Sequence, residues 1–379
     1  MNCHYFANNL CRSCPQLELP EAERAPAKMA RLRSSVQAAL GTAEALTSLW
    51  SPREVFPSRS KAKLSVTGTL ERPVLGLVDR NINATELLNC PLHFPRLNQI
   101  AALVKTLIAP CKLTPYDIKE RRGELKGLIL KANHDSSQIL LRFVLRSTDA
   151  VGRIRKILPT IQAAHPEVKV ISCNIQPIPA AVLEGPEEIV LTEQTVIWEI
   201  FGAVELAFGP QSFAQVTPET ARALYAHVAA RLATTPGMGL LDLYCGVGGF
   251  SISSAASLKW GHGVELSTQA IDCAQRAAKK NGLTQLNFSH GDVAELLKTY
   301  SGPRPDAVVV NPPRRGLSPE IIEYIKALQP RQIIYSSCNP ETLLRDLKLF
   351  MPRYQVLQLA PFDMFPLTEH VEVVATLRL

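Results

Sequence analysis

The second half of the chain alternates short apolar runs with helical segments, and this alternation restricts the fold more than any other feature. After an amphipathic helix over 217–233, the apolar runs are GLLDLYCG, HGVEL, LNFSHGD, DAVVVNPP and RQIIYSSC. Strand–helix alternation of this kind predicts a doubly wound parallel sheet. The last two apolar stretches, QVLQLAPFD and HVEVVATLRL, have no helix between them, which predicts a terminal strand pair added to that sheet.

The first half follows a different pattern, and a chain of 379 residues is long enough for two or three domains. Strand-like stretches such as LKGLILKAN and QILLRFVLR alternate there with helical segments near 94–109 and 149–164. We therefore expect an α/β protein with three parts. They are an N-terminal segment and helix over 1–57, an α+β domain over 58–205 and the parallel-sheet domain over 206–379.

Positive charge gathers in the middle of the chain. Between Ser51 and Lys156 there are 19 Lys and Arg against 9 Asp and Glu, an excess of +10, whereas the whole chain carries +7. The remaining residues therefore sum to −3. A basic region on a near-neutral protein favours a surface that binds a polyanion such as RNA. A solvated face of an ordinary domain is the alternative that composition leaves open.

The cysteines and the absence of export signals point to a reducing compartment. No stretch approaches about 18 uninterrupted apolar residues, and the N-terminus lacks the pattern of a signal peptide, so we expect a cytoplasmic protein. Nine scattered cysteines do not form a disulfide framework. The opening MNCHYFANNLCRSC, with three thiols and a histidine, is therefore a candidate metal site, for zinc or for an iron–sulfur cluster.

A glycine-rich turn and a carboxylate indicate a nucleoside-containing cofactor. In LLDLYCGVGGF an apolar strand runs into three glycines before a helix, which allows the backbone to approach a ligand closely. Glu265 ends the next strand, where a carboxylate can bind both ribose hydroxyls; an exposed helix cap is the alternative. The spacing differs from the dinucleotide motif, although NAD stays open at this point. Asn311 and the two prolines after it follow a buried strand. They are candidates for a rigid wall against which a planar group lies, and a stiff loop at the end of the strand is the alternative.

Two residues near the C-terminus have the chemistry of a covalent catalyst. Cys338 follows a strand and precedes a helix, where the positive end of the helix dipole should lower the pKa of its thiol. Buried packing is the ordinary alternative for a lone cysteine. Cys245 is the rival nucleophile, but its place inside the glycine turn favours packing. Glu372 lies on an otherwise apolar strand, where a carboxylate needs a partner or a function.

Together these stretches resemble the uracil-C5 RNA methyltransferases that use S-adenosylmethionine. The matching segments are QSFAQV, DLYCGVGGF, GVELS, VVVNPPRRG, IIYSSCNPETLLRD and HVEVV. The resemblance implies a class I methyltransferase domain at the C-terminus. It also implies S-adenosylmethionine contacts from Gln215, Tyr244, Glu265 and Asn311, with Cys338 as nucleophile and Glu372 as base. Tyr244 stands where many relatives have Phe, and Asn311 where many have Asp.

The N-terminal cysteines also match part of this family. The spacing C-x7-C-x2-C, together with a cysteine in LLNCPL, is similar to the ligand set of a 4Fe-4S cluster in the ribosomal branch: Cys3, Cys11, Cys14 and Cys90. The tRNA branch lacks these cysteines, and a second ribosomal branch adds a β-barrel for which there is no room here. The resemblance therefore implies methylation of uracil 747 in 23S rRNA. Another rRNA uracil, a tRNA, or a non-catalytic zinc-containing RNA-binding protein are the alternatives.

The mechanism that the resemblance implies begins with attack of the Cys338 thiolate on C6 of uracil, which makes C5 nucleophilic. C5 takes the methyl group, Glu372 assists removal of the C5 proton, and elimination releases the thiol. The target base must leave its stack, which is easiest in a single-stranded loop. The resemblance further implies a monomer with no obligate protein partner and no membrane. The basic residues expected to hold phosphates are Arg59, Lys61, Lys63, Arg121, Arg122, Lys126, Arg142 and Arg146.

Overall fold

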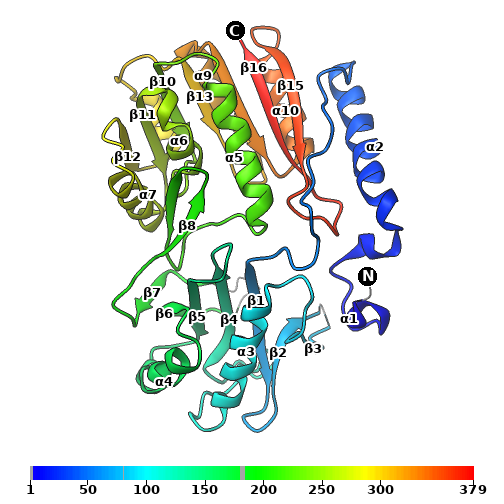
Figure 1. The fold of residues 1–379 in the computed structure, drawn as a ribbon, viewed down its shortest axis with the longest axis vertical. Coiled ribbons are helices and arrows are strands. Elements are labelled where there is room, and N and C mark those ends of the chain that lie inside the picture. Colours follow the sequence, from blue (N-terminus) through cyan, green and yellow to red (C-terminus); the bar gives the residue numbers. More distant parts are fainter. Residues whose placement is uncertain (1–2, 80, 180–183) are drawn as a thin grey trace. The chain divides into compact units, whose positions relative to one another are not determined.

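The computed structural model describes residues 3–79, 81–179 and 184–379, and the chain divides into two compact units (Figure 1). The first unit comprises Met1–Arg12, Glu54–Glu199 and Gly209–Gln211. The second unit comprises Ser13–Arg53, Ile200–Phe208 and Ser212–Leu379. The division differs from the expected one because Ser13–Arg53, with the long N-terminal helix, clusters with the C-terminal part of the chain.

The first unit is a seven-stranded mixed sheet in the order β3-β2-β1-β4-β5-β6-β7. Neighbouring strands are antiparallel except β5 and β6, which are parallel and are joined by helix α4. Apolar side chains of the two longer helices and of the sheet form its core. The elements are α1 (His4–Ala7), β1 (Lys61–Gly68), β2 (Pro73–Val78), β3 (Ala84–Glu86), α3 (Pro95–Ile108), β4 (Leu125–Ala132), β5 (Ile139–Leu145), α4 (Val151–Ala164), β6 (Val168–Ile175) and β7 (Glu187–Val190).

The second unit contains the predicted doubly wound sheet, in the order β12-β11-β10-β13-β14-β16-β15. Its first five strands are parallel. In chain order, the first elements of this unit are η1 (Pro15–Glu18), α2 (Glu21–Leu40), β9 (Val204–Phe208), α5 (Pro218–Leu232), β10 (Met238–Leu243), α6 (Gly249–Ser253), η2 (Ala255–Ser257) and β11 (Leu258–Glu265). Strand β9 pairs with β8 (Ile197–Phe201). Those that follow are α7 (Thr268–Lys280), β12 (Leu286–His290), α8 (Val293–Lys298), β13 (Ala307–Val310), α9 (Pro319–Leu328), β14 (Gln332–Ser337), α10 (Pro340–Phe350), β15 (Gln355–Phe362) and β16 (Glu372–Arg378).

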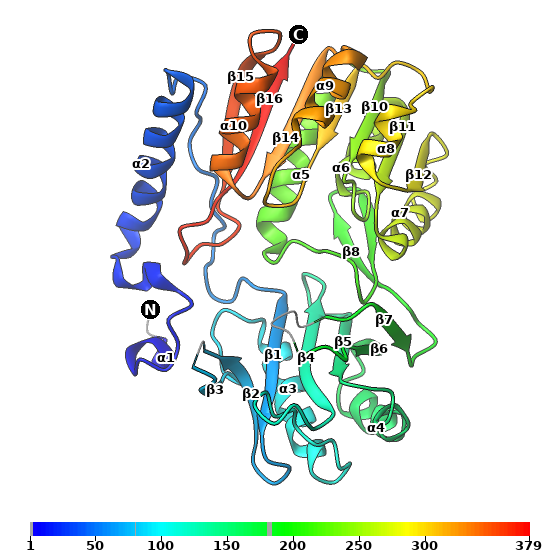
Figure 2. The ribbon, with the colours of Figure 1, turned by 180° about the vertical axis from the view of Figure 1, so that it is seen from behind.

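Helices cover both faces of this sheet, as the strand–helix alternation predicts. Figure 1 shows α5, α6 and α7 on one face, and Figure 2 shows α8, α9 and α10 on the other. The predicted terminal strand pair is also present, because β16 lies antiparallel between β14 and β15. Within this unit the carboxyl ends of five parallel strands therefore meet at one edge.

Helix α2 packs beside α10 along the edge of the second unit. Its buried stripe consists of Lys28, Leu32 and Val36, spaced four residues apart on one face. It ends at Gly41, whose φ of +78° gives the left-handed conformation common after a helix. In the part of the chain that the structure describes, no helix combines the length and apolar character needed to cross a membrane.

Candidate active site

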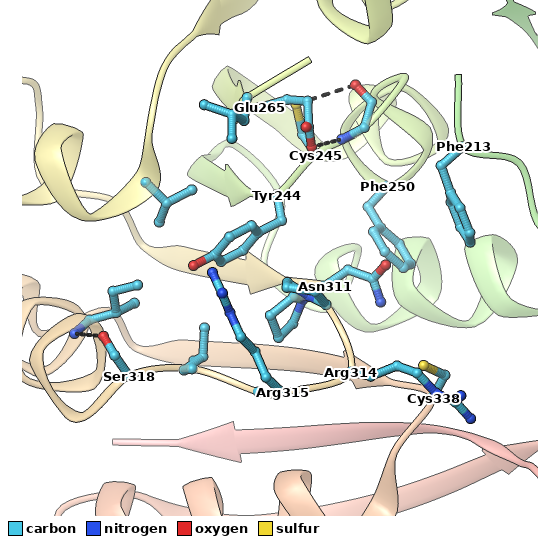
Figure 3. Close-up of a pocket in the computed structure, with 18 of the residues that line it drawn as sticks. Phe213, Tyr244, Cys245, Phe250, Glu265, Asn311, Arg314, Arg315, Ser318 and Cys338 are labelled. Carbon is cyan, nitrogen blue, oxygen red and sulfur yellow. Dashed lines mark hydrogen bonds between the residues drawn. The ribbon is translucent and has the colours of Figure 1, made fainter. Parts of the chain in front are cut away.

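A large cavity lies at the carboxyl ends of the parallel strands in the second unit, with a volume of about 1250 Å³. The strand order reverses between β10 and β13, and open α/β sheets bind ligands at such a switch point. Figure 3 shows Tyr244, Glu265, Asn311 and Cys338 around the cavity. Its walls contain all six residues predicted for cofactor binding and chemistry: Gln215, Tyr244, Glu265, Asn311, Cys338 and Glu372.

The turn after β10 exposes backbone to this cavity. Gly246 and Gly248 have φ angles of +54° and +79°, in the left-handed region that glycine adopts without a steric penalty. A Cβ on Gly249 would lie 2.6 Å from the ring of Tyr225, so this position has no room for a side chain. Tyr244 also has a positive φ, +62°, a conformation that is strained for an aromatic residue and that is common at functional sites.

Two carboxylates hold the turn in place. Glu265, at the end of β11, accepts hydrogen bonds from the backbone N–H groups of Gly246 (3.2 Å) and Ser267 (2.9 Å). The side chain of Ser267, and not that of Glu265, caps helix α7. Glu265 instead lines the cavity. Asp242 is fully buried in β10 and accepts from the backbone N–H and hydroxyl of Ser251 at the start of α6. Burial raises the pKa of Asp242 to about 7.

Cys338 lies between β14 and α10 and is half-buried in the cavity wall. The expectation that the helix dipole lowers the pKa of this thiol is wrong. Burial, followed by the nearby Glu372 carboxylate, raises the pKa of Cys338, and the hydrogen-bonded guanidinium of Arg314 only partly opposes this effect. The rival Cys245 is buried, and burial raises the pKa of its thiol well above the usual value. Cys338 is therefore the better nucleophile of the two.

Glu372 is the first residue of β16 and is only 2% exposed. Its Oε1 accepts hydrogen bonds from the hydroxyl of Ser336 (2.6 Å) and from the side-chain amide of Asn311 (3.4 Å). The same amide also donates to the carbonyl oxygen of Ser336 at 3.1 Å. Burial raises the pKa of Glu372 to about 7, although both hydrogen bonds lower it. Such a carboxyl group can gain or lose a proton near neutral pH.

Sequence reasoning missed the residue that supports the loop after β13. Asp346, in α10, is completely buried and accepts hydrogen bonds from the Leu317 backbone N–H (2.8 Å) and the Tyr335 hydroxyl (2.7 Å). Arg345 binds the other Asp346 oxygen and donates to the carbonyls of Arg315 and Leu317. An Asp on the otherwise apolar face of an amphipathic helix was the available signal, because such a residue needs partners.

Phe213 was also missed. It lines the cavity with 67% of its surface exposed (Figure 3). A large aromatic ring that is left exposed at a cavity rim offers a flat apolar surface on which a base can stack. The available signal was its position in the QSFAQV segment, two residues before Gln215.

Of the four cysteines predicted to bind a cluster, Cys3, Cys11 and Cys90 belong to the first unit and Cys14 belongs to the second. Cys3 and Cys11 pack against the core of the first unit, and the Tyr5 hydroxyl accepts a hydrogen bond from the Asn89 backbone N–H, next to Cys90. Burial raises the pKa of Cys90, and Cys3 lies near enough to add to this effect. Within residues 3–79, 81–179 and 184–379, no group of three or more His, Cys, Asp or Glu side chains is arranged to hold a metal ion.

Several of the predicted phosphate-binding cations are already paired. Arg142 is fully buried and forms ion pairs with Glu184 (2.5 Å) and Glu188 (2.6 Å), so the expectation that it contacts phosphate is wrong. Lys63 binds Glu184 as well. Burial lowers the pKa of Lys61, on the same strand, to about 8.

Of four other predicted cations, two are engaged by protein groups and two are exposed. Arg146 pairs with Glu124. Lys126 donates to the carbonyls of Gln176 (2.9 Å) and Ile178 (2.8 Å). Arg121 and Arg122, by contrast, are exposed on a turn before β4, where a phosphate can reach them. The paired and exposed cations look alike in the sequence because the acidic and carbonyl partners of the paired ones lie 22 to 121 residues away.

Known proteins resemble the chain over its whole length. A family model described as tRNA (Uracil-5-)-methyltransferase matches residues 204–378. A protein from Haemophilus influenzae (strain 86-028NP), 23S rRNA (uracil(747)-C(5))-methyltransferase RlmC, is 39% identical over 389 residues, which is 100% of this chain and 98% of the relative. The RlmC protein of Escherichia coli O157:H7 (strain EC4115 / EHEC) is 39% identical over 377 residues, which is 100% and 99% of the two chains.

A solved structure has the same fold. The crystal structure of Pyrococcus abyssi tRNA (uracil-54, C5)-methyltransferase in complex with S-adenosyl-L-homocysteine matches with a TM-score of 0.76 and 25% identity. The match covers 93% of this chain and 83% of that one.

Proposed function

The chain belongs to the RNA uracil-C5 methyltransferase family, and from this premise we propose that it methylates C5 of uracil 747 in 23S rRNA, with S-adenosylmethionine as methyl donor. The observation that carries the proposal is the cavity of the second unit. Its walls combine a thiol, Cys338, and a buried carboxyl group, Glu372, with a glycine turn and the carboxylate of Glu265. The full-length identity to RlmC proteins supports the choice of target base.

The residues around the glycine turn fit S-adenosylmethionine. We propose that Glu265 binds the ribose hydroxyls, that the Tyr244 ring packs against the cofactor, and that Gln215 and Asn311 contact it from the other walls. Burial raises the pKa of Tyr244 to about 12, so the ring stays neutral beside its ligand. When bound, the cofactor supplies a methyl group made electrophilic by the sulfonium charge. The Pyrococcus abyssi structure was determined with S-adenosyl-L-homocysteine, which supports this assignment.

Cys338 performs the first step of the proposed reaction. Its thiolate attacks C6 of uracil, a C–S bond forms, and the electrons of the C5–C6 double bond move toward the O4 oxygen. C5 thereby becomes nucleophilic and accepts the methyl group. Because its pKa is raised, the thiol must lose its proton as substrate binds, and the guanidinium of Arg314 favours the thiolate.

Glu372 performs the last step. With both C5 substituents in place, the Glu372 carboxylate removes the C5 proton, the C5–C6 double bond re-forms, and the Cys338 thiolate leaves. Ser336 and Asn311 hold one carboxylate oxygen by hydrogen bonds, which leaves Oε2 for the proton. Its pKa of about 7 suits a base that operates near neutral pH.

We propose that the target uracil enters as a flipped base from a single-stranded region, with Phe213 as a stacking surface. Arg121 and Arg122 are the exposed cations proposed to hold phosphates. Replacing both with Glu is expected to weaken RNA binding and to make the dependence of affinity on salt less steep. Unchanged affinity and salt slope would remove this turn from the RNA surface.

We further propose that Cys3, Cys11, Cys14 and Cys90 hold a 4Fe-4S cluster. The four thiol donors suit iron–sulfur ligation, and the proximity of Cys3 to Cys90 supports it. The cluster has no part in the chemistry proposed above. Anaerobically purified protein is expected to contain about four iron atoms per chain and to lose them in the Cys90→Ser variant. Zinc in place of iron would identify a zinc site.

The second candidate is methylation of a tRNA uracil, because the matching family model is that of tRNA (Uracil-5-)-methyltransferases and the Pyrococcus abyssi protein is a tRNA (uracil-54, C5)-methyltransferase. A direct test is methyl transfer from labelled S-adenosylmethionine to 23S rRNA transcripts, to transcripts with uracil 747 replaced, and to tRNA. We expect label only in the unaltered 23S transcript. Label in tRNA or in the replaced transcript would contradict the proposed target. We also propose that the protein acts as a monomer in the cytoplasm.

A further inference from the structure

The loop between β15 and β16, residues 363–371, forms part of the cavity wall. Its residues Phe365 and His370 line the cavity, and Glu372 follows the loop directly. The hydroxyl of Thr217, just before α5, donates to the carbonyl of Met364 (2.9 Å), and that of Thr220, in α5, donates to the carbonyl of Asp363 (3.2 Å). These bonds restrain the beginning of the loop. Further along, the Gln16 backbone N–H donates to the Leu367 carbonyl (3.2 Å) and Arg31 pairs with Glu369, but neither Leu367 nor Glu369 lines the cavity.

Lys28 of helix α2 reaches the rest of the loop. Although its partner residues are more than 330 positions away, its Nζ donates to Asp363 Oδ1 (2.5 Å) and to the carbonyl oxygens of Phe365 (2.9 Å) and His370 (3.4 Å). The Lys28 side chain is 2% exposed and the Asp363 side chain 8% exposed. An ammonium group has three protons to donate, and all three have acceptors here.

The contact with His370 continues toward the nucleophile. His370 Nδ1 lies 3.2 Å from Arg314 Nη2, within hydrogen-bonding distance. The Arg314 guanidinium in turn donates to the Cys338 thiol and favours its ionised form. Lys28 is thus connected to Cys338 through the His370 backbone, the His370 ring and the Arg314 side chain.

We propose that Lys28 is a positioning residue of the active site, which holds the 363–371 loop so that His370 and Arg314 are aligned with Cys338. This inference rests on the proposed function, because it concerns how the same cavity is built. A buried ion pair that served packing alone would need only the Asp363 carboxylate. Two of the three hydrogen bonds instead go to backbone carbonyls of residues that line the cavity, at the two places where the loop approaches it.

Three variants separate positioning from stability. Lys28→Met keeps the unbranched side chain as far as Cε but leaves the Asp363 carboxylate buried without its cation, so a loss of stability is expected. The double variant Lys28→Met/Asp363→Asn has no unpaired buried charge, and it should fold more stably than the single variant. Arg31→Met is the matched control, because Arg31 lies one turn further along α2 and pairs with Glu369 of the same loop at the surface, with side chains 62% and 57% exposed.

The measurements are the single-turnover rate of methyl transfer to 23S rRNA, the affinity for S-adenosylhomocysteine and the melting temperature. We expect both Lys28 variants to transfer methyl groups about tenfold to a hundredfold more slowly, because misplaced groups lose rate steeply, with cofactor affinity within about twofold of the wild type. The double variant should regain melting temperature without regaining rate. Arg31→Met should match the wild type in all three measurements.

A wild-type rate in the double variant would overturn the proposal, as would rate and cofactor affinity falling in parallel, since either result indicates a purely structural ion pair. Failure of the proposed function is distinguishable, because the wild-type protein and the Arg31→Met control would then lack methyl transfer altogether. If Lys28→Met does not fold, the rate and cofactor affinity of the double variant alone distinguish a positioning role from a purely structural one.

Discussion

Replacing Glu372 with Gln is expected to change how the stability of the protein depends on pH. Gln has nearly the same shape as Glu, and its amide oxygen can still accept the hydrogen bonds from Ser336 and Asn311. The variant therefore removes the ionisation of residue 372 with little change in packing. Because the carboxyl group is only 2% exposed, its ionisation has a cost that the structure allows us to estimate.

Burial raises the pKa of Glu372 from the ordinary 4.5 to about 7. The shift corresponds to roughly 3 kcal/mol of differential stabilisation of the protonated form. Between these two pKa values the folded state binds more protons at this site than the unfolded state, so the stability of the wild type falls as pH rises. The stabilisation is complete below the unfolded pKa of 4.5 and is lost as pH rises through the folded pKa of about 7.

The assay is urea unfolding of the wild type and of Glu372→Gln from about pH 4 to about pH 9, followed by the fluorescence of Trp50 and Trp260 in the second unit. The free energy of unfolding of the wild type minus that of the variant should fall by roughly 3 kcal/mol across the series and then level off above pH 7. The matched control is Glu369→Gln, in the loop just before β16, because the Glu369 side chain is 57% exposed and no such fall is expected for it. A difference that stays constant for Glu372→Gln would refute the argument that its carboxyl group is held protonated by burial.

Three further variants test other parts of the site and the fold. Arg314→Met should raise the pH at which Cys338 reacts with iodoacetamide, because the guanidinium favours the thiolate; an unchanged midpoint would contradict this. Gly248→Ala places a Cβ 2.9 Å from the Phe288 ring at a φ of +79° and should cost about 1–2 kcal/mol of stability and weaken cofactor binding, which calorimetry can check. Arg142→Met leaves Glu188 without its cation and Glu184 with Lys63 alone, and should destabilise the first unit by about 3–5 kcal/mol; a loss within error in urea would show that the network is dispensable.

The candidate site was largely predictable because its motifs follow successive parallel strands. Apolar runs ending in Glu265, Asn311 and Cys338 imply strands whose carboxyl ends meet at one edge, so these residues come together once the sheet is parallel. Glu372 was identifiable because a carboxylate in an apolar strand is costly without a function. The local sequence pattern therefore predicts that these residues line one site, without information on tertiary contacts.

The electrostatics of the site were not predictable because they depend on contacts between distant segments. The pKa of Cys338 is raised by burial and by Glu372, which is 34 residues further on and reaches Cys338 only when β16 pairs with β14. From the sequence, Arg142 is expected to be an exposed cation on a strand, but in the structure it is buried and paired with Glu184 and Glu188. The contact of Lys28 with Asp363 joins two ends of the chain that no periodicity relates.

The most direct test of the proposed mechanism is to trap the covalent bond between Cys338 and the RNA. Glu372→Gln is to be incubated with S-adenosylmethionine and a 23S rRNA fragment containing uracil 747, digested with protease and nuclease, and analysed by mass spectrometry. We predict a denaturant-stable adduct in which Cys338 carries a methylated uridine, and no adduct in Glu372→Gln/Cys338→Ala. An adduct on Cys245, or methyl transfer by Cys338→Ala at the wild-type rate, would contradict it.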